Sequence, residues 1–517
     1  MPHRPALFDA PSADVLAAAL TNRARARFAT VRDGLLADLL ADTVFQERKR
    51  LEHDEAPEGY AALVEGGARA LVHNVRAEVE AVLLELVASY AREIHNPFST
   101  RTYTFATSVL PGALTRLLTA SSGRNLVVGD FDPASRILLK GPIERLRKLS
   151  ETATLILAPT HVSNLDSPVI GYALYAAGLP PFAYGAGLNL FTNPVMSYFM
   201  RRLGTYTVDR RKRNRLYKET LKDYSTEILR RGCHSLFFPG GTRSRSGRLE
   251  SRLKKGLLGT GLDAWQENLA AGSPHPDVFI VPCTLSMGLV LEAETLIADA
   301  LAEEGKQRYI INDDEFSEPR TLAAFLRRIA RLDAAVHVVF GEPMDIAGNP
   351  IDEAGRSLDP HGSMIDRRGY VCDRQGSVIH DPQRDHVYTE RVAARLSEAY
   401  RRDFVVQSTH LAAWAAWESL RASRPGLDTW RLIQLPTEQR VVGRDQVERR
   451  IAAALPQLST YRRAGPESPA GILDEALVRF GTFHRKHALE AAGPNLRLSG
   501  ELTLYYRNRL EGHGLVS

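Results

Sequence analysis

Residues 155–174 read LILAPTHVSNLDSPVIGYAL, and this stretch decides the fold. Its apolar beginning predicts a buried strand, and the second apolar run at its end predicts a helix. His161 lies between them, where Ser163 and Asn164 favour a turn and a helix N-cap. Histidine exchanges a proton near neutral pH, and a carboxylate bonded to its second ring nitrogen, here Asp166, stabilises the charged ring. The stretch therefore predicts a strand that ends in a general base.

His161 and Asp166 lie five residues apart. On a continuous helix only side chains three and four apart share a face, so this pair meets only if the chain turns between them. The alternative is that Asp166 completes a capping box at the helix start without contacting the histidine. The spacing alone leaves both interpretations open.

From about residue 130 onward the hydrophobic pattern alternates between strands and helices. The predicted strands are 136–139, 154–158, 205–208, 235–238, 278–281 and 336–340. Helices are predicted between them, for example at 168–177, 216–231 and 322–332. This alternation predicts an α/β fold, in which ligands bind at the ends of the strands.

A glycine- and arginine-rich loop follows one of these strands, in residues 235–248, which read SLFFPGGTRSRSGR. Backbone N–H groups, hydroxyls and a guanidinium group together suit a phosphate. The spacing of a P-loop is absent. The candidate phosphate-binding residues of this loop are Gly241, Thr242, Arg243 and Ser244.

A second basic loop follows the strand in residues 204–211, which read GTYTVDRR. Arg210 is the candidate phosphate ligand here, because a guanidinium group meets phosphate oxygens in a bidentate manner. The alternative is that the basic run at 210–215 is only a solvated face. Pro282, at the end of the predicted strand 278–281, is expected to form a turn.

In this order the motifs resemble those of the glycerolipid acyltransferase superfamily. His161 and Asp166 match its HxxxxD motif, and three further blocks match at 208–210, 241–244 and 281–282. The resemblance covers roughly residues 130–345. Three other strings resemble the glycerol-3-phosphate acyltransferase branch, at 216–219, 338–343 and 505–509. The resemblance to the superfamily implies an α/β fold with a mixed sheet flanked by helices.

The sequence departs from that family pattern at two positions. The third block usually has a glutamate before its glycine, and this chain has Gly240 there. The second block has Asp209, which is more similar to lysophosphatidate acyltransferases than to the Ile-Arg-Arg of the glycerol-3-phosphate branch.

The resemblance implies a fatty acyl transfer from acyl-CoA or acyl carrier protein to the hydroxyl of glycerol-3-phosphate, which gives lysophosphatidate. His161 is then the general base, Asp166 orients it, and Arg210 and Arg243 bind the phosphate. Donors near the turn after Thr160, or in the third block, stabilise the oxyanion. We expect no cofactor, no metal and no acyl-enzyme.

Three alternatives remain open at this point. Two keep the chemistry and change the acceptor to lysophosphatidate or dihydroxyacetone phosphate. The third is a non-catalytic basic protein that binds a membrane or nucleic acid, although the basic runs lack the interleaved aromatic residues of nucleic-acid motifs. We expect no nucleic-acid partner.

Composition describes an ordinary globular protein of 517 residues with a net charge of +5, which suits an anionic substrate or an acidic membrane surface. No apolar run is long enough to cross a bilayer, and the N-terminus lacks a secretory signal. We expect a cytoplasmic protein, peripheral on the cytoplasmic face of a membrane.

An apolar stretch at 182–200, followed by two arginines, is either core or a lipid-facing surface. Few cysteines occur, in keeping with a reducing compartment, at positions 233, 283 and 372.

We predict four regions along the chain, and no internal repeat. They are a helical N-terminal region (1–125), the α/β acyltransferase domain (126–345), a loop or hairpin insertion (346–387) and a helical C-terminal region (388–517).

Overall fold

The computed structural model describes residues 12–55, 57–108, 136–191, 194–303, 335–482, 484 and 486–516. The helix predicted at 322–332 lies outside these residues, as do both ends of the predicted N-terminal region and the first ten residues of the predicted α/β domain.

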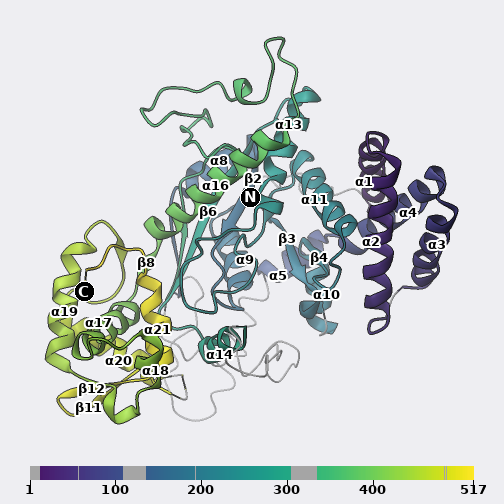
Figure 1. Ribbon diagram of the computed structural model, residues 1–517. Helices are drawn as coiled ribbons and strands as arrows, with labels where there is room; N and C mark the ends of the chain where they lie inside the picture. The colour runs from purple at the N-terminus through teal and green to yellow at the C-terminus, as the bar shows by residue number, and fades with distance from the viewer. Residues whose placement is uncertain are drawn as a thin grey trace.

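A seven-stranded sheet lies at the centre of the molecule, in the order β1-β7-β6-β2-β5-β3-β4 (Figure 1). Its strands are β1 (Ile137–Lys140), β2 (Thr154–Pro159), β3 (Ala183–Gly187), β4 (Thr205–Val208), β5 (Ser235–Leu236), β6 (Val278–Met287) and β7 (Val336–Phe340). Neighbours are parallel except β6 and β7, which pair antiparallel. The sheet is therefore mixed, and the predicted α/β class is confirmed.

Strand β2 explains why its sequence is apolar at every position. Leu155 and Leu157 face one side, where they join a core with α8 (Ile143–Thr152) and α9 (Asp166–Ala176). Ile156 and Ala158 face the other side. The helices that share this second core are α11 (Arg215–Arg230), α12 (Lys255–Leu258), α13 (Thr260–Ala270) and α16 (Pro382–Asp403). A strand covered on both faces reads as a continuous apolar run.

Two features of the sheet differ from the prediction. Strand β3, in residues 183–187, was not expected, because its glycines and alanines have low strand propensity. Pro282 does not form a turn but lies inside β6, which continues to Met287. The proline is tolerated because β6 changes partner at this position. The carbonyl of Pro282 accepts the N–H of Gly341, just beyond the end of β7.

The described N-terminal residues form five helices, four of which pack against one edge of the sheet domain (Figure 1). These helices are α1 (Ala13–Ala29), α2 (Asp33–Leu51), α3 (Tyr60–His73), α4 (Arg76–Ile94) and α5 (Thr100–Ser108). The core of α1–α4 includes Tyr206 of β4 and Tyr217 and Tyr224 of α11. Asn96, just after α4, donates a hydrogen bond to Thr207 Oγ1 at 3.0 Å.

The C-terminal region surrounds the buried helix α17 (Ser408–Ser423). Other helices there are α18 (Thr429–Gln434), α19 (Arg444–Gln457), α20 (Pro469–Gly481) and α21 (Gly500–Arg507). Short strands add to the predicted helices: β8 (Val405–Val406) pairs with β10 (Arg462–Arg463), and β9 (Val441–Gly443), β11 (Leu489–Ala492) and β12 (Asn495–Leu498) form a small sheet. The core includes Val162 and Leu249, so this region packs directly on the histidine turn and the third block. The division into four regions stays a prediction.

The segment between β7 and α16 contains an internal repeat, and the prediction that none exists was wrong. An aspartate recurs every seven residues, and a glycine follows it three residues later. The aspartates are 345, 352, 359, 366 and 373, and the glycines are 348, 355, 362, 369 and 376. We name residues 345–376 the Asp-Gly repeat; the chain there extends beyond α8 and α13 in Figure 1 (green).

Four of the five repeat units close their turns in the same way. In the unit of Asp352, Oδ1 accepts the N–H groups of Ala354 and Arg356, and the carbonyl accepts the N–H of Gly355. Gly355 has a φ of +80°, which a glycine adopts at no steric cost. The period is shorter than that of common repeat families, so each unit resembled an isolated polar turn.

Candidate active site

The chain turns between His161 and Asp166, and the two side chains meet. Asp166 Oδ2 lies 2.8 Å from His161 Nδ1. The same oxygen accepts the backbone N–H groups of Val162 at 2.5 Å and Ser163 at 2.9 Å. Asp166 is fully buried, and its Oδ1 has no hydrogen-bond partner among the described residues, whereas the histidine side chain is 19% exposed. Asp166 begins α9, but the histidine contact excludes the interpretation that it only caps this helix.

Glu292, which follows β6, supports the same turn from the other side. Its Oε2 accepts the Ser163 hydroxyl at 2.9 Å, and its Oε1 accepts the Asn164 N–H at 3.0 Å. Burial raises the pKa of Glu292, and these two bonds offset part of that rise. No spacing in the sequence connects Glu292 with the histidine turn, so sequence reasoning missed it.

The third block lies directly against His161. The N–H of Ser244 donates to the His161 carbonyl at 2.8 Å, and the Ser244 hydroxyl donates to the Arg248 carbonyl at 2.6 Å. The ring of Phe238, at the start of the loop, stacks on the histidine ring with centroids 4.1 Å apart. The structure therefore brings together the histidine and the glycine-rich loop that the sequence placed in separate motifs.

Cationic groups from two other segments meet at Gly241, and a third, Arg243, belongs to the same loop. Arg210 Nη2 donates to the Gly241 carbonyl at 3.1 Å. Gly241 has a φ of +77°, and a Cβ added there would lie 2.6 Å from Lys254 Nζ. Arg243 lies in the same loop, and its guanidinium has no hydrogen-bond or ion-pair partner within the described ranges, while its charge is attracted by Glu292. Thr242, between Gly241 and Arg243 in the chain, is exposed.

The basic run after β4 is not the uniform solvated face that was the alternative interpretation. Arg211 is engaged by Asp209 and Asp54, each with an N–O distance of 2.9 Å. Burial raises the pKa of Asp209, but its bonds from Arg211 outweigh burial and hold the pKa below the ordinary value. Lys212 is buried between tyrosine rings and pairs with Glu93. Asp209 thus shapes this turn through Arg211.

Every backbone N–H from residue 160 to 165 already has an acceptor. The N–H of Thr160 donates to the Cys283 carbonyl, and that of His161 to Glu250. Those of residues 162 and 163 both donate to Asp166, that of 164 donates to Glu292, and that of 165 to the Ser163 hydroxyl oxygen. The backbone N–H groups of the turn after Thr160 are therefore engaged within the protein. In the third block, the N–H groups of Thr242 and Arg243 have no acceptor among the described residues. The loop is the better candidate of the two predicted sources.

The C-terminal string at 505–509 reaches this site from the far end of the chain. Asn508 Nδ2 donates to the Ser246 carbonyl at 2.9 Å, and Arg248 Nε pairs with Glu511 at 2.5 Å. A Cβ added at Gly247 would lie 2.1 Å from the Tyr505 carbonyl oxygen, so the two backbones are in close contact. The string therefore supports the third block.

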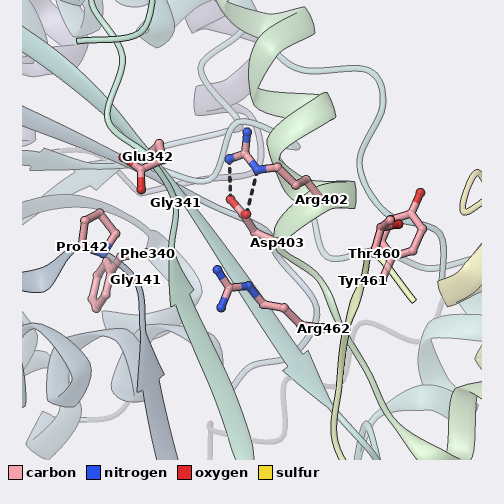
Figure 2. Close-up of a pocket in the computed structure, with 10 residues that line it drawn as sticks. All are labelled: Gly141, Pro142, Phe340, Gly341, Glu342, Arg402, Asp403, Thr460, Tyr461 and Arg462. Atoms are coloured by element: carbon pink, nitrogen blue, oxygen red, sulfur yellow. Dashed lines mark hydrogen bonds and ion pairs between the residues drawn. The ribbon is translucent and has the colours of Figure 1, made fainter. Parts of the chain in front are cut away.

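A pocket of about 660 Å³ lies at the end of β7, between the sheet and the C-terminal region (Figure 2). Its polar side chains include Glu342, Arg402, Asp403 and Arg462, and Arg402 forms two hydrogen bonds with Asp403, each of 2.9 Å. No residue of the HxxxxD motif or of the second and third blocks lines this pocket.

Comparison with protein families identifies the domain that carries this site. The family described as Acyltransferase matches residues 142–286, which include the histidine turn and the second and third blocks. Residues 142–286 are therefore the part of the chain that is similar to acyltransferase domains.

Two relatives of this domain are both named glycerol-3-phosphate acyltransferase. The chain is 36% identical over 154 residues to the glycerol-3-phosphate acyltransferase of Histophilus somni, covering 29% of this chain and 18% of the relative. It is 32% identical over 207 residues to that of Glaesserella parasuis, covering 39% and 23%. The match therefore spans about a fifth of the length of these relatives.

One solved structure, the 1-acyl-sn-glycerophosphate (LPA) acyltransferase of Thermotoga maritima, matches 61% of this chain and 94% of its own. The sequence identity is 16% and the TM-score is 0.28, so this likeness carries no argument here.

Proposed function

We propose that the protein transfers a fatty acyl group from a thioester, acyl-CoA or acyl carrier protein, to the hydroxyl of glycerol-3-phosphate and so forms lysophosphatidate. The observation that carries this proposal is the contact between two loops. His161, fixed by Asp166, lies against a glycine-rich loop at which Arg210, Lys254 and Arg243 gather. A base next to a phosphate site suits an acceptor that has a hydroxyl close to its phosphate.

The ring of His161 is held in one tautomer. Nδ1 carries the proton that is donated to Asp166, so Nε2 is the basic nitrogen. Nε2 removes the proton of the acceptor hydroxyl while the oxygen attacks the thioester carbonyl carbon. The tetrahedral intermediate then collapses, the C–S bond breaks, and the thiolate takes the proton back from the imidazolium. Asp166 stabilises the imidazolium between the two steps.

The oxyanion of the intermediate needs donors outside the histidine turn. The third block supplies the backbone N–H groups of Thr242 and Arg243 for this oxyanion. The guanidinium groups of Arg210 and Arg243, with Lys254, then hold the acceptor phosphate. This assignment uses each predicted site residue, with Ser244 joining the loop to the His161 carbonyl.

The name of the matched relatives supports glycerol-3-phosphate as the acceptor over lysophosphatidate or dihydroxyacetone phosphate. The test offers purified protein a labelled acyl-CoA with each of the three acceptors in turn and identifies the product. We expect lysophosphatidate from glycerol-3-phosphate, and loss of turnover in His161→Ala. Acyl transfer at the wild-type rate by His161→Ala would refute the mechanism, and a product from lysophosphatidate alone would change the acceptor.

The proposed site of contact with a membrane is the surface of α5 and α10 (Pro194–Arg202). No helix in the described ranges is long and apolar enough to cross a membrane. Tyr198 is 51% and Phe105 48% exposed, and Phe105 stacks on Phe199. The guanidinium of Arg202 lies 4.0 Å from the ring centre of Tyr198. Aromatic rings beside arginines suit the interface of an anionic bilayer.

Other residues of the predicted apolar stretch belong to the core. Phe182 is buried and stacks on His234, and Met200 is also buried.

Flotation with vesicles of phosphatidylglycerol and phosphatidylcholine tests the proposed membrane surface of α5 and α10. We expect binding that falls in the double variant Phe105→Ser/Tyr198→Ser and is retained in the core-distant control Val478→Ser, which replaces an exposed residue of α20. Equal binding by both variants would remove this surface from the proposal.

A further inference from the structure

One carboxylate beside the site is not used by the mechanism above. Glu250, six residues after Ser244, turns its Oε1 toward the histidine turn and accepts the backbone N–H of His161 at 2.6 Å. Its Oε2 is buried without a hydrogen-bond partner among the described residues. An unpaired buried carboxylate oxygen is costly, so this placement calls for a reason.

The side chain of Glu250 occupies space that only a glycine at position 240 leaves open. A Cβ added at Gly240 would lie 2.8 Å from Glu250 Cγ and 3.4 Å from its Oε1. A contact of 2.8 Å is too short to be accommodated without movement, so a side chain at 240 would displace the side chain of Glu250 from this position. Position 240 is also the place at which the sequence departs from the third block of the family that it resembles.

Charged groups from distant parts of the chain surround this carboxylate. The guanidinium of Arg509 and the ring of His161 both attract its charge. Arg509 is itself buried, donates to the Tyr505 hydroxyl at 3.0 Å, and has an Nη1 without a partner within the described part of the chain. Tyr400 donates its hydroxyl to the carbonyl of Ala158, one strand residue before the turn. Glu250 is therefore close to the charge of Arg509, and α16 contacts strand β2, which leads into the histidine turn.

We propose that Glu250 is a positioning residue for His161, and that its carboxylate takes the place of one that position 240 does not provide. Asp166 fixes the ring through Nδ1, and Glu250 fixes the backbone that carries the ring. Glycine at 240 and glutamate at 250 then form a matched pair. The proposal rests on the proposed function, because the value of a held histidine is the transfer that it catalyses.

The test moves the carboxylate between the two positions in the full-length protein. Four variants are compared: Glu250→Ala, Glu250→Gln, Gly240→Glu, and the double variant Gly240→Glu/Glu250→Ala. The matched control is Glu490→Ala, which removes an exposed carboxylate that pairs with Arg497 in the small C-terminal sheet, away from the site. For each, kcat and KM for glycerol-3-phosphate are measured with acyl-CoA.

We expect Glu250→Ala to lower kcat about 100-fold, with a much smaller change in KM, because small displacements of a catalytic group have effects of this size. Gly240→Glu alone also lowers kcat, since its Cβ displaces Glu250. The double variant recovers at least about tenfold over Glu250→Ala, because contacting positions are coupled. The control keeps the wild-type kcat. A kcat for Glu250→Ala within twofold of wild type, or a double variant no better than Glu250→Ala, would overturn the proposal.

A second readout does not depend on acyl transfer. Diethyl pyrocarbonate modifies neutral histidine, so its rate at His161 at about pH 8, followed by peptide mass spectrometry, reports how the ring is presented to solvent. We expect a changed rate in Glu250→Ala and the wild-type rate in Glu250→Gln, because the amide oxygen still accepts the His161 N–H. A wild-type rate in Glu250→Ala would refute the role of Glu250, and Glu250→Met, which keeps the length of the side chain without the acceptor oxygen, decides if Glu250→Ala does not fold.

The two proposals fail separately. Wild-type protein that transfers no acyl group to any of the three acceptors refutes the proposed function, and the modification rate then still tests Glu250. Active wild-type protein with Glu250→Ala unchanged in both readouts refutes the positioning role alone.

Discussion

An aspartate side chain closes both the turn of His161 and the turns of the Asp-Gly repeat by accepting two backbone N–H groups. Asp166 Oδ2 accepts those of Val162 and Ser163, which precede it, and Asp352 Oδ1 accepts those of Ala354 and Arg356, which follow it. Asp166 is fully buried and also binds a histidine ring, whereas Asp352 is partly exposed and binds an arginine of its own turn. The two regions therefore share an aspartate that accepts backbone N–H groups, and they differ in turn geometry and in candidate chemistry.

The difference between the two regions is the number of chain segments that meet at the turn. At His161 these are the third block, Glu292 after β6, and Glu250. Around Asp352 the hydrogen bonds of the side chain stay within five consecutive residues. An aspartate turn becomes a candidate active site here because distant segments supply a base, cations and burial. The predictions below separate these two kinds of turn.

The largest effect is expected from matched aspartate-to-asparagine variants. In Asp166→Asn the amide presents an N–H to the ring, which favours the tautomer with the proton on Nε2 and removes the base. We expect kcat to fall about 10³-fold or more, as for the corresponding carboxamide change in a serine protease triad. Asp352→Asn should leave kcat within twofold of wild type. Steady-state kinetics of the two variants checks both, and an Asp166→Asn enzyme with over a tenth of the wild-type kcat would contradict the assignment.

The next effect follows from opposite pKa shifts in the two regions. Bonds from the backbone and side chain of Arg356 lower the pKa of the partly exposed Asp352, while burial raises that of Glu250 to about 7. Folded wild type therefore binds more protons at Glu250 than the unfolded chain does between pH about 4.5 and 7, and its stability falls as the pH rises through this window. Arg509 and His161 face Glu250 and limit the rise.

Glu250→Gln removes this titration, so its stability relative to wild type should increase from pH 5 to pH 8 by up to about 3 kcal/mol. Urea unfolding of both proteins at the two pH values measures the difference. Asp352→Asn serves as the control, and its stability relative to wild type should not increase over the same interval. The prediction would be wrong if the free energies of unfolding of wild type and Glu250→Gln changed with pH in parallel. The carboxylate would then already be ionised in the folded protein at pH 5.

A smaller effect distinguishes the arginines of the two regions. Arg243 has no ion-pair partner among the described residues, whereas Arg356 bonds its own Asp352 at 2.7 Å. Arg243→Ala should raise KM for glycerol-3-phosphate about 10- to 100-fold through loss of charge-assisted bonds to phosphate. Arg356→Ala should leave KM unchanged. The same kinetics with a longer acceptor concentration series measures both, and an unchanged KM in Arg243→Ala would place the phosphate elsewhere.

The sheet was largely predictable because its strands are apolar and separated by turn residues. The runs at 154–158, 205–208 and 336–340 correspond to β2, β4 and β7. Strand β3 was missed because its identity depends on pairing with β4 and β5 rather than on its own residues. Pro282 was misplaced because a local rule about proline ignores a change of strand partner at that position.

Only those contacts of the site that join residues close together in the chain could be predicted from the sequence. His161 and Asp166 are close in the chain, and a turn between them suffices to make the contact. Glu250, Glu292 and Arg509 have no spacing relation to the histidine, and their burial depends on tertiary packing. Gly240 was the only available signal: a departure from the family pattern marked the place that Glu250 fills.

The remaining effects are expected within the repeat, on stability alone, where burial varies and the turn is constant. Asp345 is fully buried and accepts four hydrogen bonds, including those of Asn349 Nδ2 and the Ser357 hydroxyl. Asp359 accepts two backbone N–H groups, from residues 361 and 363, in a more exposed turn. Asp345→Ala leaves buried donors unpaired and should cost about 2–3 kcal/mol, and Asp359→Ala about 0.5–1 kcal/mol. Urea unfolding measures both, and kcat should stay unchanged in each, because neither aspartate contacts a segment of the site. Equal losses of stability would mean that turn geometry, rather than burial, sets the contribution of these aspartates.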